Sequence, residues 1–177
     1  RIGYPQLDDV RFFLFRNGKL ATTYHTGDRK PFAERPIQHP QFLFPTSLVA
    51  SNNYEVLIRV ETNGAVQLPL QVWEPNALFS HLSLQDQAHA LYYGILLTII
   101  CFNLAIFLVL RERTYLYYVL TIASYLAFMA SLRGTAFAVL WPDSPWLHNQ
   151  AMLVSVPTTI LFSALFARSF LRLDRNN

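Results

Sequence analysis

Residues 91–110 read LYYGILLTIICFNLAIFLVL, and no other part of the sequence constrains the fold as strongly. The stretch contains no Asp, Glu, Lys or Arg. Roughly 20 apolar residues in a helix cross the hydrocarbon core of a bilayer. A helix buried in a water-soluble bundle normally keeps a charged face at helical spacing, which this stretch lacks. It therefore predicts a membrane-spanning helix.

Two further charge-poor runs follow the first. One covers residues 114–132 and is separated from the first run by only three residues, and the other predicts a helix at about residues 149–171. Both are long enough to cross a bilayer, and the loops between the runs are short. The sequence therefore predicts an α-helical transmembrane bundle in the second half of the chain.

Basic residues near the helix ends predict the orientation. Lys and Arg collect in cytoplasmic loops, whereas Trp favours the membrane–water interface. The second loop, residues 134–149, has no Lys or Arg and carries Trp141 and Trp146. We therefore expect this loop and the N-terminal half outside the membrane. The arginines expected inside are Arg111 and Arg113 in the first loop and Arg168, Arg172 and Arg175 after the third helix.

Several residues of the predicted helices suit helix packing. Small residues every fourth position let another helix approach closely, an amide hydrogen-bonds across helices, and proline kinks a helix. No mid-membrane Asp, Glu, Lys, Arg or His marks an ion pathway in these spans, which counts against a transporter. The packing candidates are Asn103, Ala123, Ala127, Ser131 and Pro157.

The N-terminal half has a different composition. Residues 1–86 hold eight Lys or Arg and eight Asp or Glu, so the formal net charge of +3 comes from the second half. A balanced charge provides no electrostatic attraction for phosphates, which excludes a nucleic-acid-binding surface. The half is rich in β-branched and aromatic residues, as strands are.

Turn signals divide this half into strands. Asn17-Gly18 between residues 10–16 and 19–26 predicts a β-hairpin, because both turn positions need positive φ. Residues 54–61 and 66–72 alternate in polarity and predict a second hairpin, and residues 41–44 predict a short strand. Five strands in so short a stretch indicate an incomplete β-sandwich. We expect the sandwich at 1–76, a helical stalk at 77–90 and the transmembrane region at 91–177.

No motif in the sequence indicates chemistry. The five histidines lack metal-ligand spacing and are expected to be solvated, and Cys101 alone forms neither an internal disulfide nor a cysteine-based zinc site. Neither a nucleophile elbow nor a phosphate-binding loop is present. The sequence thus predicts no catalytic residue, metal or cofactor. Tyr24, Arg59 and Trp73 are candidate ligand contacts, although strand packing explains them equally well.

The run YYGILLTIICFNLAIFLVLRERTYLYYVL, continued by SLRGTAFAVLWPDSPWL, resembles the bacterial seven-transmembrane receptors with diverse intracellular signalling modules. RFFLFRNGKLATTYHTGDRKPFAERPIQHPQFLFP, followed by YEVLIRVETNGAVQLPLQVWEP, is similar to the second half of the type-2 extracellular domain of that family. The resemblance implies a jelly-roll-like periplasmic sensor for a small molecule or carbohydrate. It also implies seven helices in the bacterial inner membrane, of which three are expected here.

The same resemblance implies a cytoplasmic signalling domain in cis, and leaves a homodimer open. Our primary interpretation is a signal-transducing receptor fragment that has no enzyme activity of its own. One alternative is a membrane-anchored diguanylate cyclase or histidine kinase whose catalytic domain lies outside these residues. A second alternative is a transporter subunit with a periplasmic accessory domain.

Overall fold

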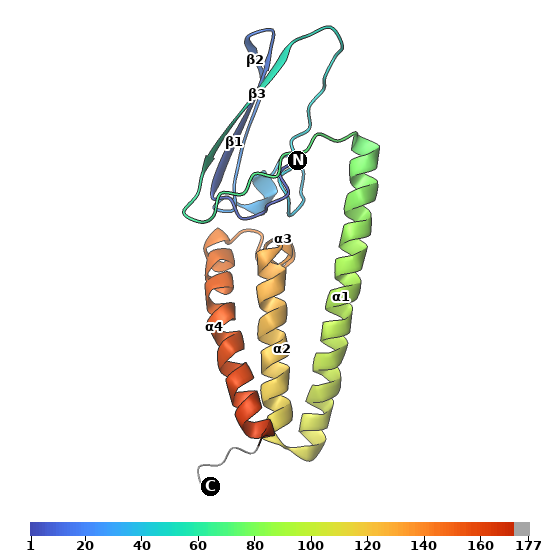
Figure 1. Ribbon diagram of the computed structural model, residues 1–177, viewed down its shortest axis with the longest axis vertical. Coiled ribbons are helices and arrows are strands. Elements are labelled where there is room, and N and C mark those ends of the chain that lie inside the picture. Colours follow the sequence, from blue (N-terminus) through green and yellow to red (C-terminus); the bar gives the residue numbers. More distant parts are fainter. Residues whose placement is uncertain (172–177) are drawn as a thin grey trace. The chain divides into compact units, whose positions relative to one another are not determined.

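The computed structural model describes residues 1–171 (Figure 1). It contains a three-stranded sheet, a single 3₁₀ turn and four helices. The described chain divides into two compact units, and residues 131–149 belong with the N-terminal unit rather than with the long helices. We call residues 1–72 the β module and residues 131–149 the connecting segment. The elements are β1 (Asp9–Arg16), β2 (Lys19–Thr26), η1 (Phe32–Glu34), β3 (Tyr54–Glu61), α1 (Pro75–Leu110), α2 (Arg113–Leu132), α3 (Thr135–Val139) and α4 (Pro145–Phe170).

The first predicted hairpin is confirmed. β1 and β2 pair antiparallel, and the turn residues Asn17 and Gly18 have φ of 51° and 77°. Two left-handed residues in sequence match the twist of the flanking strands, which is why Asn-Gly directs this turn. The register shifts between Leu14 and Phe15, where β2 carries one extra residue.

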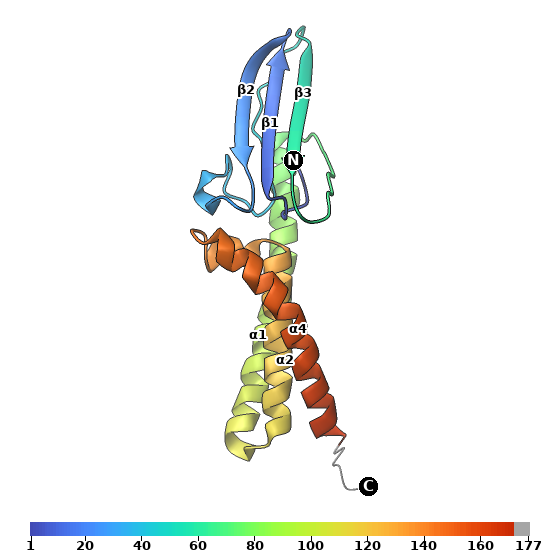
Figure 2. The ribbon, with the colours of Figure 1, turned by 90° about the vertical axis from the view of Figure 1, so that its left-hand side faces the viewer.

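The predicted second hairpin is wrong. β3 pairs antiparallel with β1, which therefore lies between β2 and β3 (Figure 2). Residues 66–72 form no strand and make only an isolated bridge from Leu70 to Ile2, because Pro69 has no N–H to donate to a ladder. The β1–β3 register instead places apolar residues opposite each other: Val10 and Val60, Phe12 and Ile58, Leu14 and Val56.

The predicted short strand at residues 41–44 is also reduced to a bridge, between Phe42 and Ile2. Within residues 1–171 the β module thus has a single three-stranded sheet in place of five strands. The alternating burial along β1 gives that sheet one core face. The second layer of a jelly roll stays a prediction. The core is formed by Ile2, Leu7, Val10 and Phe42, with Tyr4, Phe44, Ile58 and Val60 packed against it.

α1 is longer than a bilayer requires. Its 36 residues rise about 54 Å, against a hydrocarbon core of about 30 Å. Residues 80–89 belong to this helix, as the absence of Gly and Pro there predicts. The helix begins with Pro75 and ends at Leu110. Arg111 caps it with a left-handed φ of 58°, and the Arg111 N–H donates to the Phe107 carbonyl at 2.8 Å.

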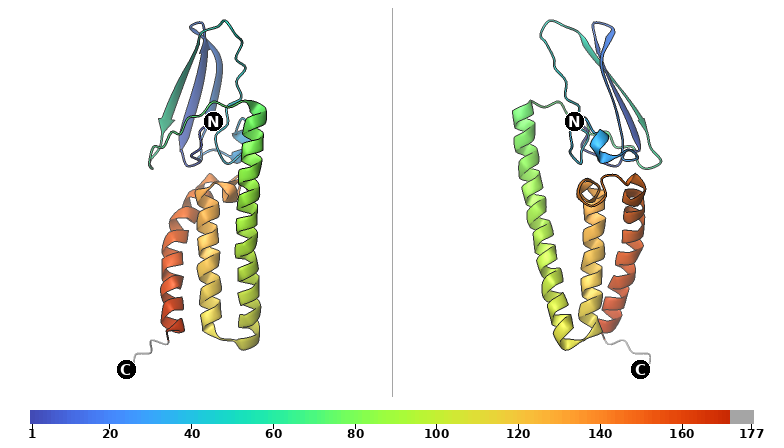
Figure 3. Two further views of the ribbon diagram at one scale, coloured as in Figure 1. Left: turned by 45° about the vertical axis from the view of Figure 1, so that its right-hand side comes forward. Right: turned by 180° about the vertical axis from the view of Figure 1, so that it is seen from behind.

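α1, α2 and α4 are each long and apolar enough to cross a membrane, which confirms the three predicted spans. They lie side by side in both views of Figure 3. α2 and α4 are connected by a 2.7 Å hydrogen bond between the hydroxyls of Thr114 and Ser169, and by the rings of Tyr118 and Phe166. Most of their apolar surface remains exposed, as expected of helices that face lipid or further helices.

Candidate functional site

One charged side chain is buried where the β module contacts the connecting segment. Arg35 follows η1 and is 5% exposed. Its Nη1 donates to the carbonyls of His39 and Pro40, at 2.9 and 2.5 Å. These bonds tie the guanidinium to the loop after η1. Charge-assisted hydrogen bonds of this kind contribute about 1.5–3 kcal/mol each.

Aromatic rings enclose the same guanidinium. Its central carbon lies 4.8 Å from the ring centre of Phe32, 4.5 Å from that of Phe42 and 5.8 Å from that of Phe137. A desolvated cation over ring faces gains about 2 kcal/mol. Two of these rings belong to the β module and the third, Phe137, lies in α3. Arg35 is therefore held from both sides of one contact.

The connecting segment supplies the other side of the contact. Phe137 is fully buried, packs edge-on against Phe32 with ring centres 5.6 Å apart, and stacks on His148 at 4.8 Å. His148 is 2% exposed, so the expectation that the histidines are solvated is wrong for this one. Its Nδ1 has no hydrogen-bond partner within the described part of the chain. We call Phe32, Arg35, Phe42, Phe137 and His148 the Arg35 cluster.

Polar contacts surround the cluster. The N–H of Phe32 donates to the Pro142 carbonyl at 2.9 Å, and Nε2 of Gln6 donates to the Leu132 carbonyl at 3.2 Å. Gly134 has a left-handed φ of 72°, and a Cβ there would lie 3.5 Å from Cβ of Pro40. The two chain segments thus meet through backbone as well as side chains.

A carboxyl group lies near the buried arginine. Asp28 is 3% exposed, and its N–H donates to the Leu7 carbonyl at 2.9 Å. Burial, reinforced by the negative charge of Asp8, raises the pKa of Asp28 to about 6, although Arg35 and Arg29 oppose this shift. Burial also lowers the pKa of Arg35 to about 10, so the guanidinium stays charged at neutral pH.

Tyr24 and Arg59 are not brought together. The register places Tyr24 of β2 beside Phe12 of β1, and Arg59 of β3 beside Arg11, the residue of β1 that precedes Phe12. Because successive residues point to opposite faces of a sheet, the two candidates lie on opposite faces and cannot line one pocket. The Tyr24 hydroxyl donates to the Pro45 carbonyl at 2.8 Å, and Arg59 is paired with Glu61 at 3.4 Å. Their ligand contact stays a prediction.

Trp73 belongs to the other unit. It stacks on His81 of α1, with ring centres 5.0 Å apart. A role for Trp73 in ligand binding likewise stays a prediction.

The predicted packing residues have different surroundings. Asn103 donates to the Ile99 carbonyl at 2.8 Å within α1, rather than to a neighbouring helix. Ser131 is fully buried, whereas Ala127 is exposed. Pro157 lies inside α4, which is bent in Figure 2, and proline kinks a helix by removing a backbone donor.

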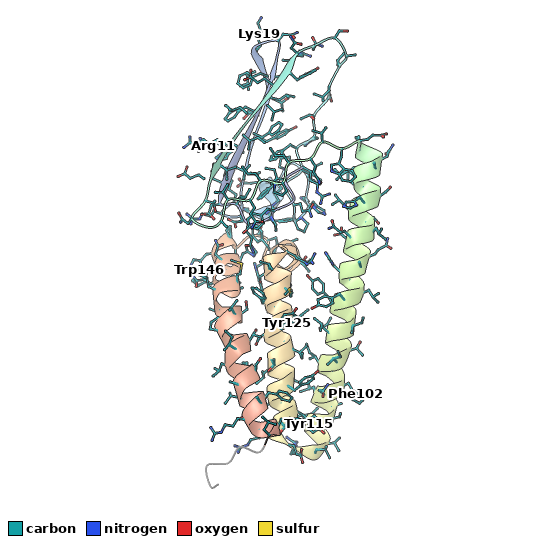
Figure 4. The ribbon with its side chains drawn as sticks, in the orientation of Figure 1. Arg11, Lys19, Phe102, Tyr115, Tyr125 and Trp146 are labelled. Carbon is teal, nitrogen blue, oxygen red and sulfur yellow. The ribbon has the colours of Figure 1, made fainter. Side chains whose placement is uncertain are left out.

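The residues that predict orientation lie at helix ends. Arg111 caps α1, Arg113 begins α2 and Arg168 lies in the last turn of α4. Aromatic residues lie at both ends of these helices: Tyr115 is in the first turn of α2, near Arg113, whereas Trp146 is in the first turn of α4, at the end opposite to Arg168 (Figure 4). Arg172 and Arg175, the other two arginines of this prediction, lie outside the described residues.

Sequence reasoning missed the Arg35 cluster. Arg35 lies in a stretch of ten residues that contains three prolines, Pro31, Pro36 and Pro40. So many prolines indicate a rigid loop that could hold a side chain in one position. Nothing in the sequence, however, connects that loop with Phe137. The sequence signal for this site was the proline content of the loop alone, and composition does not identify which residues are in contact.

Two family models match the chain. The model described as 7TM diverse intracellular signalling matches residues 85–177, and the model described as 7TMR-DISM extracellular 2 matches residues 1–74. No curated protein and no solved structure matches the chain.

Proposed function

Because this chain belongs to the 7TM diverse intracellular signalling family, whose members are membrane receptors with an extracellular domain, we propose that its β module senses a periplasmic ligand and relays the signal to a cytoplasmic domain. The observation that carries this proposal is the unit formed by the β module and the connecting segment. A module that contacts the loop between two spans is placed to act on both.

The orientation belongs to the proposal. Arg111, Arg113 and Arg168 flank one end of the spans, whereas the connecting segment carries Arg133 alone. This asymmetry supports a cytoplasmic location for the arginine-rich ends. The β module then lies in the periplasm, and the membrane is the bacterial inner membrane.

The ligand and the output are proposed at the level of chemical class. Aromatic and guanidinium groups that reach the surface recognise sugars or small carboxylates, and the candidates are the half-buried Tyr24 and Trp73 and the exposed Arg59. Since Tyr24 and Arg59 lie on opposite faces, at most one of them belongs to a given site. The output is a cytoplasmic module in cis, either a diguanylate cyclase or a histidine kinase, and the receptor works as a monomer or a homodimer.

A transporter subunit is the second candidate. Transport sites in membranes are built from ionisable or polar residues that face a cavity. Residues 91–110, 114–132 and 149–167 contain no Asp, Glu, Lys, Arg or His. This composition favours the receptor.

Cysteine accessibility tests the receptor topology. In a Cys101→Ser background, single cysteines replace Lys19, Ser144 and Glu112, all of which are exposed. A membrane-impermeant thiol reagent should label Lys19→Cys and Ser144→Cys in spheroplasts, and Glu112→Cys only after lysis. Labelling of Glu112→Cys alone in intact spheroplasts would place the β module in the cytoplasm and reject a periplasmic sensor.

A further inference from the structure

We infer that Arg35 holds the β module against the connecting segment, and we call this contact the joint. We further infer that movement of the sensor is passed through the joint to α2 and α4, and so into the membrane. The inference rests on the proposed receptor function and adds the route by which the signal passes. It assigns Arg35 a positioning role, exerted through Phe137 and His148.

The first argument is that the contact is tight on both sides. Arg35 and Phe32 reach Phe137 across the contact at 5.8 and 5.6 Å, and the Phe32 N–H donates to the Pro142 carbonyl. Phe137 in turn stacks on His148 in the first turn of α4. A continuous chain of packed groups therefore leads from the loop after η1 to α4.

The second argument is the cost of leaving the joint half-formed. A guanidinium in an aromatic enclosure is stable while the enclosure is complete, but a buried charge that loses its partners strongly destabilises the fold. Arg35 Nε, one Asp28 carboxylate oxygen and His148 Nδ1 already lack hydrogen-bond partners within residues 1–171. Because packed contacts tend to have discrete arrangements, we expect this cluster to be either engaged or released rather than partly formed.

The third argument is the covalent path. The connecting segment holds the last two residues of α2 and the first five of α4, so its displacement acts on both helices directly. The other covalent path, to α1, follows residues 62–74, which form no strand or helix, are mostly exposed, and are held to the start of the chain through the Leu70–Ile2 bridge. An irregular exposed segment transmits force less effectively than a packed one.

Disulfide trapping tests the contact in native membranes. In the Cys101→Ser background, Pro40→Cys and Gly134→Cys should form a disulfide within minutes of mild oxidation, because their Cβ atoms would lie 3.5 Å apart, at the short end of disulfide geometry. The control pair is Lys19→Cys with Gly134→Cys, since Lys19 lies at the hairpin tip, about 23 Å along β2 from Thr26 (Figure 4). This pair should remain reduced.

Matched variants test the role of Arg35. Arg35→Met should slow formation of the 40–134 disulfide about tenfold, whereas Arg29→Met, at an exposed arginine on the other side of η1, should not. Phe137→Ala, compared with exposed Val139→Ala, repeats the test from the connecting segment without altering the β module. Arg35→Lys should restore part of the rate, because it keeps the charge but not the planar stacking.

Amide hydrogen exchange tests through which helices the displacement passes. Arg35→Met should speed exchange in residues 128–132 and 145–150 and leave residues 75–90 of α1 unchanged. Faster exchange confined to α1 would overturn the proposed route. Unchanged trapping in both Arg35→Met and Phe137→Ala would overturn the joint.

The trapping result separates this inference from the receptor proposal. If both thiols of the 40–134 pair are accessible from outside but do not join, the joint is wrong and the receptor topology stands. If they are accessible from opposite sides of the membrane, the topology itself is wrong.

Discussion

Arg35 and Asp28 are charged groups placed inside the protein, where water cannot solvate them. Arg35 is compensated by two carbonyls and three rings, so it stays charged. Asp28 has the weaker compensation, because Asp8 opposes its charge while Arg35 and Arg29 favour it. The two residues respond differently to pH for this reason.

Asp28 gives the β module a pH-dependent stability. Its pKa rises from 3.8 to about 6 on folding, so between pH 4 and 6 the folded chain keeps a proton that the unfolded chain has released. The free energy of unfolding therefore falls as the pH rises through this window, by at most about 3 kcal/mol, and the loss is complete above pH 6. Below pH 4 Asp28 is protonated in both the folded and the unfolded chain, so it adds no pH dependence to the free energy of unfolding.

Asp28→Asn should remove the pH-dependent contribution of this carboxyl group to the free energy of unfolding. We expect the free energy of unfolding of the variant, relative to the original chain, to increase between pH 4 and 6 by up to about 3 kcal/mol. Denaturant unfolding in detergent, followed by fluorescence at pH 4, 5, 6 and 7, measures it. Asp143→Asn, at an exposed position, is the control. A difference that does not change with pH would show that Asp28 is not protonated in the folded chain.

Among the elements, β1 and α4 each form where the local sequence predicts them, but each also bonds to a partner that the local sequence does not identify. β1 forms the predicted hairpin with β2, but its other edge is taken by β3 because apolar residues align there. α4 accepts Pro157 in its middle and is joined to α2 near its own C-terminal end, through the hydroxyls of Ser169 and Thr114. Cross-helix hydrogen bonds within a membrane are worth about 0.6 kcal/mol on average.

A double-mutant cycle should detect the α2–α4 bond. Thr114→Val and Ser169→Ala each remove one hydroxyl of the 2.7 Å pair, and we expect a coupling energy of about 0.6 to 1.7 kcal/mol between them. Thermal unfolding in detergent measures it. Thr98→Val, which removes a hydroxyl bonded to Gly94 within α1, is the comparison and should show no coupling with Ser169→Ala. Additive effects of Thr114→Val and Ser169→Ala would contradict the bond.

At the scale of the whole molecule, the proposed orientation follows from where the arginines lie. Arg111 and Arg113 lie at the connection between α1 and α2, which is the shorter of the two connections between the described spans, and basic residues beside span ends act strongly on topology. The β module carries eight Lys or Arg and six Asp or Glu, but a domain of this length translocates largely regardless of its charge and adds little to this asymmetry. A receptor that inserts in one orientation therefore depends on a few side chains.

Replacing those side chains should produce mixed orientation. In Arg111→Gln/Arg113→Gln, we expect about a tenth or more of the molecules to insert inverted. Impermeant labelling of Lys19→Cys, before and after lysis, measures the inverted fraction. Arg11→Gln/Arg16→Gln in the β module is the matched control and should stay uniform. Uniform insertion of the loop variant would mean that other features set the topology.

Local patterns in the sequence were sufficient for the three spans, the Asn17-Gly18 hairpin and the family. Hydropathy and turn chemistry depend on neighbouring residues, so they can be read without a fold. Tertiary structure was needed for the partner of β3, the separation of Tyr24 from Arg59, and the enclosure of Arg35 by Phe137. These depend on contacts between residues far apart in the chain, whose energy comes from burial and alignment of groups that no local pattern pairs.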